Sequence, residues 1–218
     1  MIVPASDAFF QEAARLLKQG GLVAFPTETY YGLGVDPCNT EALQKLFAVK
    51  QRAADKPVLV LVAEQSQVPL LAEETPEPLR LLMNRCWPGP LTLVFPAKKN
   101  LPEPLTGGSG TVGIRQSPEP TAALLLAAFG GPITATSANR SGQPAAVTAA
   151  DVEAAFGTDI DLILDGGRTP GGAGSTLVGW DGQKLRCFRE GRIPFAECAA
   201  SLAEVNNEES LLTMTSVG

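Results

Sequence analysis

The stretch from Asp7 to Gly34, DAFFQEAARLLKQGGLVAFPTETYYGLG, carries the pattern that decides the fold. Apolar residues recur at helical spacing over Asp7–Gln19, and the pair Gly20-Gly21 is typical of a helix end. The apolar run Leu22–Phe25 then has the length of a buried strand, which Pro26 ends. A helix followed directly by a buried strand indicates an α/β fold.

The same alternation continues along the rest of the chain. We expect further strands at Val58–Val62, Leu91–Phe95, Thr111–Ile114, Ile133–Thr136, Leu162–Leu164, Thr176–Trp180 and Lys184–Arg189. We expect further helices at Glu41–Arg52, Pro78–Cys86 and Thr121–Phe129, and one that ends near Phe156. Thr40 is the expected cap of the first, and Thr148 to Asp151 resembles a capping box.

Mixed local and crossover connections predict one open, twisted mixed sheet flanked by helices. A single domain is expected over residues 1–204. The polar, weakly patterned segment 205–218 is expected to be a disordered tail.

Composition excludes several classes of chemistry. The 218 residues include no histidine, which removes Ser-His-Asp and Cys-His nucleophilic schemes and imidazole zinc sites. Seventeen basic and 23 acidic residues give a net charge of -6 and an isoelectric point near 4.8, which disfavours a general nucleic-acid coat. The four cysteines form no C-x-x-C pair, so free thiols in a reducing cytosol are expected.

No apolar stretch reaches the roughly 20 residues that cross a bilayer, and the first residues do not resemble a signal peptide. We therefore expect a soluble, cytoplasmic protein without a membrane partner.

Two polar segments near the N-terminus are candidates for binding. Pro26–Gly34 follows a predicted strand, and ligands of open α/β sheets bind beyond the carboxyl ends of strands. Lys50-Gln51-Arg52, with Lys56 nearby, offers cations for a polyphosphate. Taken alone, an ordinary turn and solvated cations at a helix end explain these residues somewhat better.

Two later segments have the same ambiguity. Thr136–Gly142 alternates hydroxyl, amide and guanidinium groups after a predicted strand, but a solvated turn explains it equally well. The glycine-rich segment Gly166–Thr176 lacks the lysine of a phosphate-binding P-loop and leads into a strand, so we reject that assignment. Arg115 and Arg189 each end a predicted strand and add charge to the same edge.

The combination of motifs is more specific than any one of them. In order along the chain stand Pro26–Gly34, Lys50-Gln51-Arg52, Lys56-Pro57, Trp87–Thr92, Ser137-Ala138-Asn139, Ser175-Thr176 and Arg189-Glu190-Gly191. This pattern closely resembles the short bacterial form of the YrdC/Sua5 family, the L-threonylcarbamoyladenylate synthases. The resemblance runs from about Ala8 to about Ala199, and it implies a concave, locally basic pocket.

The resemblance implies that ATP, L-threonine and bicarbonate or CO2 give threonylcarbamoyl-AMP and pyrophosphate, with Mg2+ as a helper and no protein metal site. The product would serve N6-threonylcarbamoyladenosine formation at position 37 of tRNA, through a downstream transferase complex and without stable binding of nucleic acid by this chain. The family's K-x-R and S-x-N pairs match Lys50, Arg52, Ser137 and Asn139, which are the catalytic candidates. By the same matching, ATP would contact Arg52, Lys56, Thr111, Asn139 and Arg189, and threonine would contact Thr29, Arg115, Ser137 and Ser175.

Two departures from the family pattern concern the threonine end. Leu61 stands near the place where some relatives have a histidine, and the proline that usually follows the strand-end arginine arrives late, as Pro118. An RNA-binding module and a paralogous carbamoyl- or adenylyl-transferring enzyme are the alternative functions. The acidic charge and 6% aromatic content count against RNA binding by stacking.

Overall fold

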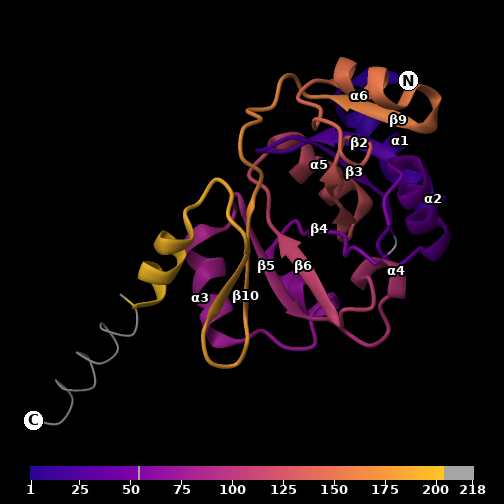
Figure 1. The fold of residues 1–218 in the computed structure, drawn as a ribbon. Coiled ribbons are helices and arrows are strands. Elements are labelled where there is room, and N and C mark those ends of the chain that lie inside the picture. Colours follow the sequence, from indigo (N-terminus) through magenta and orange to yellow (C-terminus); the bar gives the residue numbers. More distant parts are fainter. Residues whose placement is uncertain (54, 204–218) are drawn as a thin grey trace, which may run out of the picture.

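The computed structural model describes residues 1–53 and 55–203, and its strands form two mixed sheets (Figure 1). The expected tail lies outside the described residues. The five-stranded sheet has the order β1 (Ile2–Pro4), β9 (Leu162–Asp165), β2 (Val23–Pro26), β3 (Tyr31–Gly34) and β8 (Thr136–Ser137). Its first three strands run parallel, whereas β3 pairs antiparallel with β2 and with β8.

The six-stranded sheet has the order β11 (Leu185–Arg189), β10 (Thr176–Trp180), β5 (Leu91–Pro96), β6 (Thr111–Arg115), β4 (Val60–Leu61) and β7 (Ile133–Thr134). The pairs β10/β5 and β4/β6 are parallel and the others antiparallel. The α/β class with mixed sheets is therefore confirmed, although the strands divide between two sheets.

Helices pack against both faces of the five-stranded sheet and against one face of the six-stranded sheet. They include α1 (Asp7–Lys18), α2 (Thr40–Lys50), α3 (Glu77–Cys86), α4 (Glu103–Thr106), α5 (Pro120–Phe129) and α6 (Ala149–Phe156), with 3-10 turns at Gln65–Leu70 and Gly157–Asp159. Residues 195–203 are also helical. Buried residues of α1 and α5 pack on β1, β2 and β9, while α3 packs on β5 and β10 (Figure 1). The opposite face of the six-stranded sheet is left for the site described below.

One predicted strand connects the two sheets. The segment expected as a single strand at Ile133–Thr136 divides into β7 and β8, which belong to different sheets. Between them the Ala135 amide donates to the Leu59 carbonyl at 2.9 Å. Apolar alternation cannot reveal such a change of partner, because the burial pattern is the same in either sheet.

Several predicted boundaries were wrong, while the capping box at Thr148 is confirmed. The side chain of Asn39 rather than Thr40 caps α2, by accepting from the Ala42 amide. This helix ends before Arg52 because Gln51 adopts the left-handed conformation, with φ of 51°. The polar segment Pro26–Gly34, predicted as a loop, contains the hairpin to β3, and the strand expected at 58–62 is only two residues long.

Candidate active site

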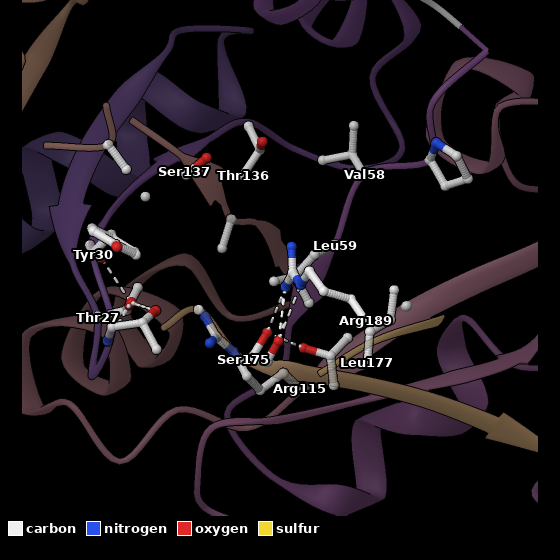
Figure 2. Close-up of a pocket in the computed structure, with 18 of the residues that line it drawn as sticks. Thr27, Tyr30, Val58, Leu59, Arg115, Thr136, Ser137, Ser175, Leu177 and Arg189 are labelled. Carbon is white, nitrogen blue, oxygen red and sulfur yellow. Dashed lines mark hydrogen bonds between the residues drawn. The ribbon is translucent and has the colours of Figure 1, made fainter. Parts of the chain in front are cut away.

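A cavity of about 790 Å³ lies between the two sheets and is lined by residues from both (Figure 2). Eight of the ten predicted site residues line it: Thr29, Arg52, Thr111, Arg115, Ser137, Asn139, Ser175 and Arg189. The other two, Lys50 and Lys56, do not. Segments as distant in sequence as the hairpin and β11 therefore meet at one hollow, as the motif combination predicts.

The six-stranded sheet supplies one wall of the cavity. Thr111, Gly113 and Arg115 alternate along β6 and point to the same face, as side chains two residues apart do in a strand. A Cβ at Gly113 would lie 3.3 Å from the Cγ2 atom of Thr92 on β5. Glycine therefore keeps this part of the wall open.

The opposite wall begins at the turn between β2 and β3. Thr27 and Thr29 are buried, with their hydroxyls 3.1 Å apart, and the Thr27 hydroxyl donates to the Tyr30 carbonyl at 2.7 Å. The glycine-rich segment is attached here, because the Gly171 amide donates to the Thr29 carbonyl at 2.8 Å. This turn thus has a fixed shape with hydroxyls at the cavity.

Three arginines line the cavity. Arg189 donates from Nη2 to the carbonyl of Ser175 at 2.9 Å and to its hydroxyl at 3.2 Å (Figure 2). Arg52 donates to the Pro57 carbonyl at 2.8 Å. Arg115 is 2% exposed and forms an ion pair with Glu28 at 2.7 Å.

The charges of these arginines are only partly compensated. Burial lowers the pKa of Arg52 and that of Arg115, and the positive charge of Arg189 lowers both further, while Glu28 opposes the shift at Arg115. The Nε atoms of Arg52 and Arg115 are buried without a partner among the described residues. Buried donors of this kind are ready to bind an anion.

Lys50 is buried beside the cavity rather than in it. Its side chain leaves α2 and donates from Nζ to the Ser137 carbonyl and, at 2.7 Å, to the Asn139 carbonyl. The Ser141 amide in turn donates to the Lys50 carbonyl at 2.9 Å. Burial, followed by the charge of Arg52, lowers the pKa of Lys50 to about 7. The lysine therefore shapes the loop that presents Ser137 and Asn139.

That loop has an internal network of its own. The Ser137 hydroxyl donates to Oδ1 of Asn139 at 2.6 Å, and Nδ2 of Asn139 donates to the Gln143 carbonyl at 2.8 Å. The S-x-N pair is thus a single hydrogen-bonded unit at the cavity edge.

Two predicted positions lie elsewhere. Lys56 is exposed and does not line the cavity. Leu61 is fully buried in the core with α5 and also does not line it, whereas Leu59 does. Leu59, and not Leu61, is therefore the leucine of this segment that contributes apolar surface to the cavity.

The comparisons with known proteins agree with this geometry. The Sua5/YciO/YrdC family model, described as telomere recombination, matches residues 15–191. The chain belongs to this family. It is 38% identical over 183 residues to the threonylcarbamoyl-AMP synthase of Vibrio cholerae, covering 83% of this chain and 96% of that protein. It is 39% identical over 193 residues to the threonylcarbamoyl-AMP synthase of Pyrococcus abyssi, covering 88% of this chain and 57% of the relative.

Solved structures extend the comparison. P. abyssi Sua5 complexed with L-threonine matches with a TM-score of 0.89 and 36% identity, over 92% of this chain and 60% of that one. Escherichia coli YciO matches with a TM-score of 0.77 at 23% identity, over 86% and 91% of the two chains, and shows the shared fold. The chain thus spans about 60% of the P. abyssi relative and nearly all of the Vibrio relative.

The structure adds cavity residues that sequence reasoning missed. Thr92 lies in the quoted Trp87–Thr92 motif and is 2.8 Å from the Ser175 hydroxyl, and Thr27 stands in the first motif. Thr27 directly follows Pro26 at the end of β2, and Thr92 follows the proline-containing segment Trp87–Pro90, which was the available signal. Their burial was not visible, since it depends on pairing between strands far apart in sequence.

Neither a metal-ligand cluster nor a membrane-spanning helix is found within residues 1–53 and 55–203. No group of three or more Cys, Asp or Glu side chains there is arranged to hold a metal ion. Within the same residues, no helix combines the length and apolar character of a membrane span.

Proposed function

We propose that this member of the Sua5/YciO/YrdC family is a cytoplasmic enzyme that converts ATP, L-threonine and bicarbonate or CO2 into threonylcarbamoyl-AMP and pyrophosphate. One observation carries the proposal: Arg52, Arg115 and Arg189 meet buried hydroxyls in one cavity large enough for a nucleotide and an amino acid. The names of the relatives and the threonine-bound neighbour support the same activity. The product would serve N6-threonylcarbamoyladenosine formation in tRNA through a downstream transferase complex.

The nucleotide would occupy the side of the cavity with Arg52 and Arg189. These two guanidinium groups repel each other, so a triphosphate between them relieves the repulsion and supplies acceptors for unpaired N–H groups. Thr111 and Asn139 offer polar contacts along the same cavity, and exposed Lys56 would attract the nucleotide from outside.

Threonine would bind with its carboxylate against Arg115. The hydroxyls of Thr29, Ser137 and Ser175 line the same cavity and offer hydrogen bonds to the amino acid. The side chains of Val58 and Leu59 provide apolar surface for its methyl group.

Catalysis in this site would depend on positioning and electrostatics. The neutral threonine amine and CO2 form a carbamate and release a proton to solvent. One carbamate oxygen then attacks the α-phosphorus while the bond to pyrophosphate breaks. The arginines stabilise the negative charge on the oxygens of the transferring phosphoryl group and on the departing pyrophosphate. Lys50 contributes by holding the carbonyls of the Ser137–Asn139 loop.

Magnesium would bind in this site as a complex with the nucleotide phosphates. No Asp or Glu is among the described residues that line the cavity, so the donor set suits an ion held by phosphate oxygens and water. The ion would offset phosphate charge and leave the arginines to orient the reacting groups.

The direct test is mass-spectrometric detection of the adenylate after mixing protein, ATP, threonine and bicarbonate. Pyrophosphate release should require threonine and bicarbonate together, and Arg52→Ala should reduce it strongly while Lys56→Ala serves as the exposed control. Release with a different acceptor in a substrate panel would favour the paralogous transferase. Tight, salt-sensitive tRNA binding without pyrophosphate release would favour the RNA-binding module.

A further inference from the structure

The Glu28–Arg115 ion pair connects the two sheets behind the cavity. Glu28 follows β2 of the five-stranded sheet, and Arg115 ends β6 of the six-stranded sheet. Oε1 of Glu28 lies 2.7 Å from Nη1 of Arg115, and the two side chains are 11% and 3% exposed. We propose that Glu28 is a positioning residue that fixes the Arg115 guanidinium for the substrate carboxylate. This inference rests on the proposed function.

The contacts of Glu28 place it behind the arginine. Its second oxygen accepts a hydrogen bond from the Ser117 hydroxyl, which itself accepts from the Glu119 amide at 3.2 Å. Glu28 does not line the large cavity, whereas it lines a separate cavity of about 190 Å³ together with Glu119. The carboxylate therefore acts on substrate only through Arg115.

The late proline of this chain acquires a structural meaning here. Gln116 and Ser117 stand between Arg115 and Pro118, and Ser117 is the residue that donates to Glu28. One carboxylate thus holds two residues of the same loop, Arg115 and Ser117. The contact between Nη1 and Oε1 is an ion pair without the geometry of a hydrogen bond. Glu28 therefore holds the guanidinium by its charge, and through Ser117 it also holds the backbone that follows Arg115.

The N–H groups of Arg115 that do not face Glu28 are left for the substrate carboxylate. Nε is buried without a partner among the described residues, and the nearby charge of Arg189 repels the guanidinium. The carboxylate of Glu28 offsets that repulsion and keeps Arg115 in place. Without the Glu28 carboxylate, Arg115 remains charged, but its guanidinium no longer has one fixed orientation toward the substrate carboxylate.

The structure also contains a matched control. Glu77 pairs with Arg80 at 2.5 Å, but these side chains are both 55% exposed on α3. Exposed pairs of this kind contribute little, because water and salt screen them. Glu77→Gln removes the same charge as Glu28→Gln without touching the site.

The test measures Michaelis constants for threonine and ATP, and threonine binding by calorimetry. Glu28→Gln should raise the KM for threonine about 10- to 100-fold and weaken threonine binding in parallel, with the KM for ATP changed less than about threefold. Ser117→Ala should have a smaller effect in the same direction, and Glu77→Gln should have none. An unchanged threonine KM in Glu28→Gln, or an equal rise for both substrates, would overturn the proposal.

Two further measurements separate the possible failures. Thermal unfolding identifies a variant that fails to fold; in that case Glu28→Asp, which keeps a carboxylate, must give an intermediate threonine KM or the proposal is wrong. Wild-type protein that binds threonine but forms no adenylate would refute the proposed function alone, since calorimetry still tests Glu28. Wild-type protein that does not bind threonine would refute both.

Discussion

Two buried cations of this site, one lining the cavity and one beside it, are stabilised in different ways. Arg115 and Lys50 are each 2% exposed. Arg115 faces the carboxylate of Glu28, whereas the Lys50 ammonium is held by two backbone carbonyls and has Arg52 as its charged neighbour. The arginine consequently keeps its charge at the cavity, while the lysine gives up its proton near pH 7.

The two side chains therefore have different roles: Arg115 supplies a positive charge, whereas Lys50 fixes the conformation of a loop. A neutral amine still has two N–H groups, enough for the carbonyls of Ser137 and Asn139. Lys50 can therefore hold its loop whether or not it is protonated. A guanidinium at the substrate carboxylate, by contrast, is useful because it is always charged.

The largest effect should follow removal of Arg115. In Arg115→Met, the kcat/KM for threonine should fall about 10²- to 10³-fold, because the carboxylate loses its charged partner. The free energy of unfolding should fall by about 3–5 kcal/mol, since Glu28 is left buried beside an apolar side chain. Pyrophosphate release and urea unfolding measure the two effects.

The double variant Arg115→Met/Glu28→Gln sharpens this prediction. It removes both charges, so most of the lost stability should return while activity stays low. Recovery of activity in the double variant would show that Arg115 does not bind substrate.

The variant Lys50→Met tests whether the buried lysine holds the Ser137–Asn139 loop. Losing both hydrogen bonds to the loop should reduce kcat about 10- to 100-fold, with Lys56→Met as the exposed control. The pH dependence of stability provides a second readout. Folded Lys50 loses its proton near pH 7, whereas an unfolded lysine keeps it to about 10.5, so unfolding takes up a proton between these values.

The stability of the wild type relative to Lys50→Met should consequently rise with pH in that interval. The limiting slope is about 1.4 kcal/mol per pH unit. Burial raises the pKa of Cys86 and Cys198, which acts in the opposite direction, but these thiols are present in both proteins. Urea unfolding at pH 7.5 and 9.5 measures the difference, and a constant difference would contradict a buried Lys50 with a lowered pKa.

The sequence was informative where function requires a side chain after a strand. Thr29, Arg115, Ser137 and Arg189 were predicted from such positions and meet at the cavity. The family resemblance was required to combine them, because each segment alone also fits a solvated turn. The capping box at Thr148 was predictable for a simpler reason, since its contacts span only three residues.

The sequence was not informative about the residues that position these side chains. The pair Lys50 and Arg52 was predicted to act together, but the left-handed Gln51 ends the helix between them and places them differently. Glu28 was quoted only as part of a motif. Its partner Arg115 is 87 residues away and in another sheet, and such pairing depends on tertiary topology that local patterns do not contain.

The smallest effect should come from Lys56, which the matching placed at ATP but which is exposed outside the cavity. Lys56→Ala should raise the KM for ATP by less than about threefold at low salt, because its charge attracts the nucleotide through solvent. The difference should disappear near 0.5 M salt, where the Debye length is only about 4 Å. Arg52→Ala should keep its defect at the same salt, since this side chain is half-buried in the cavity wall, with a buried Nε, and is screened less. A large, salt-independent defect in Lys56→Ala would place this lysine on the phosphates and would extend the cationic end of the cavity beyond Arg52.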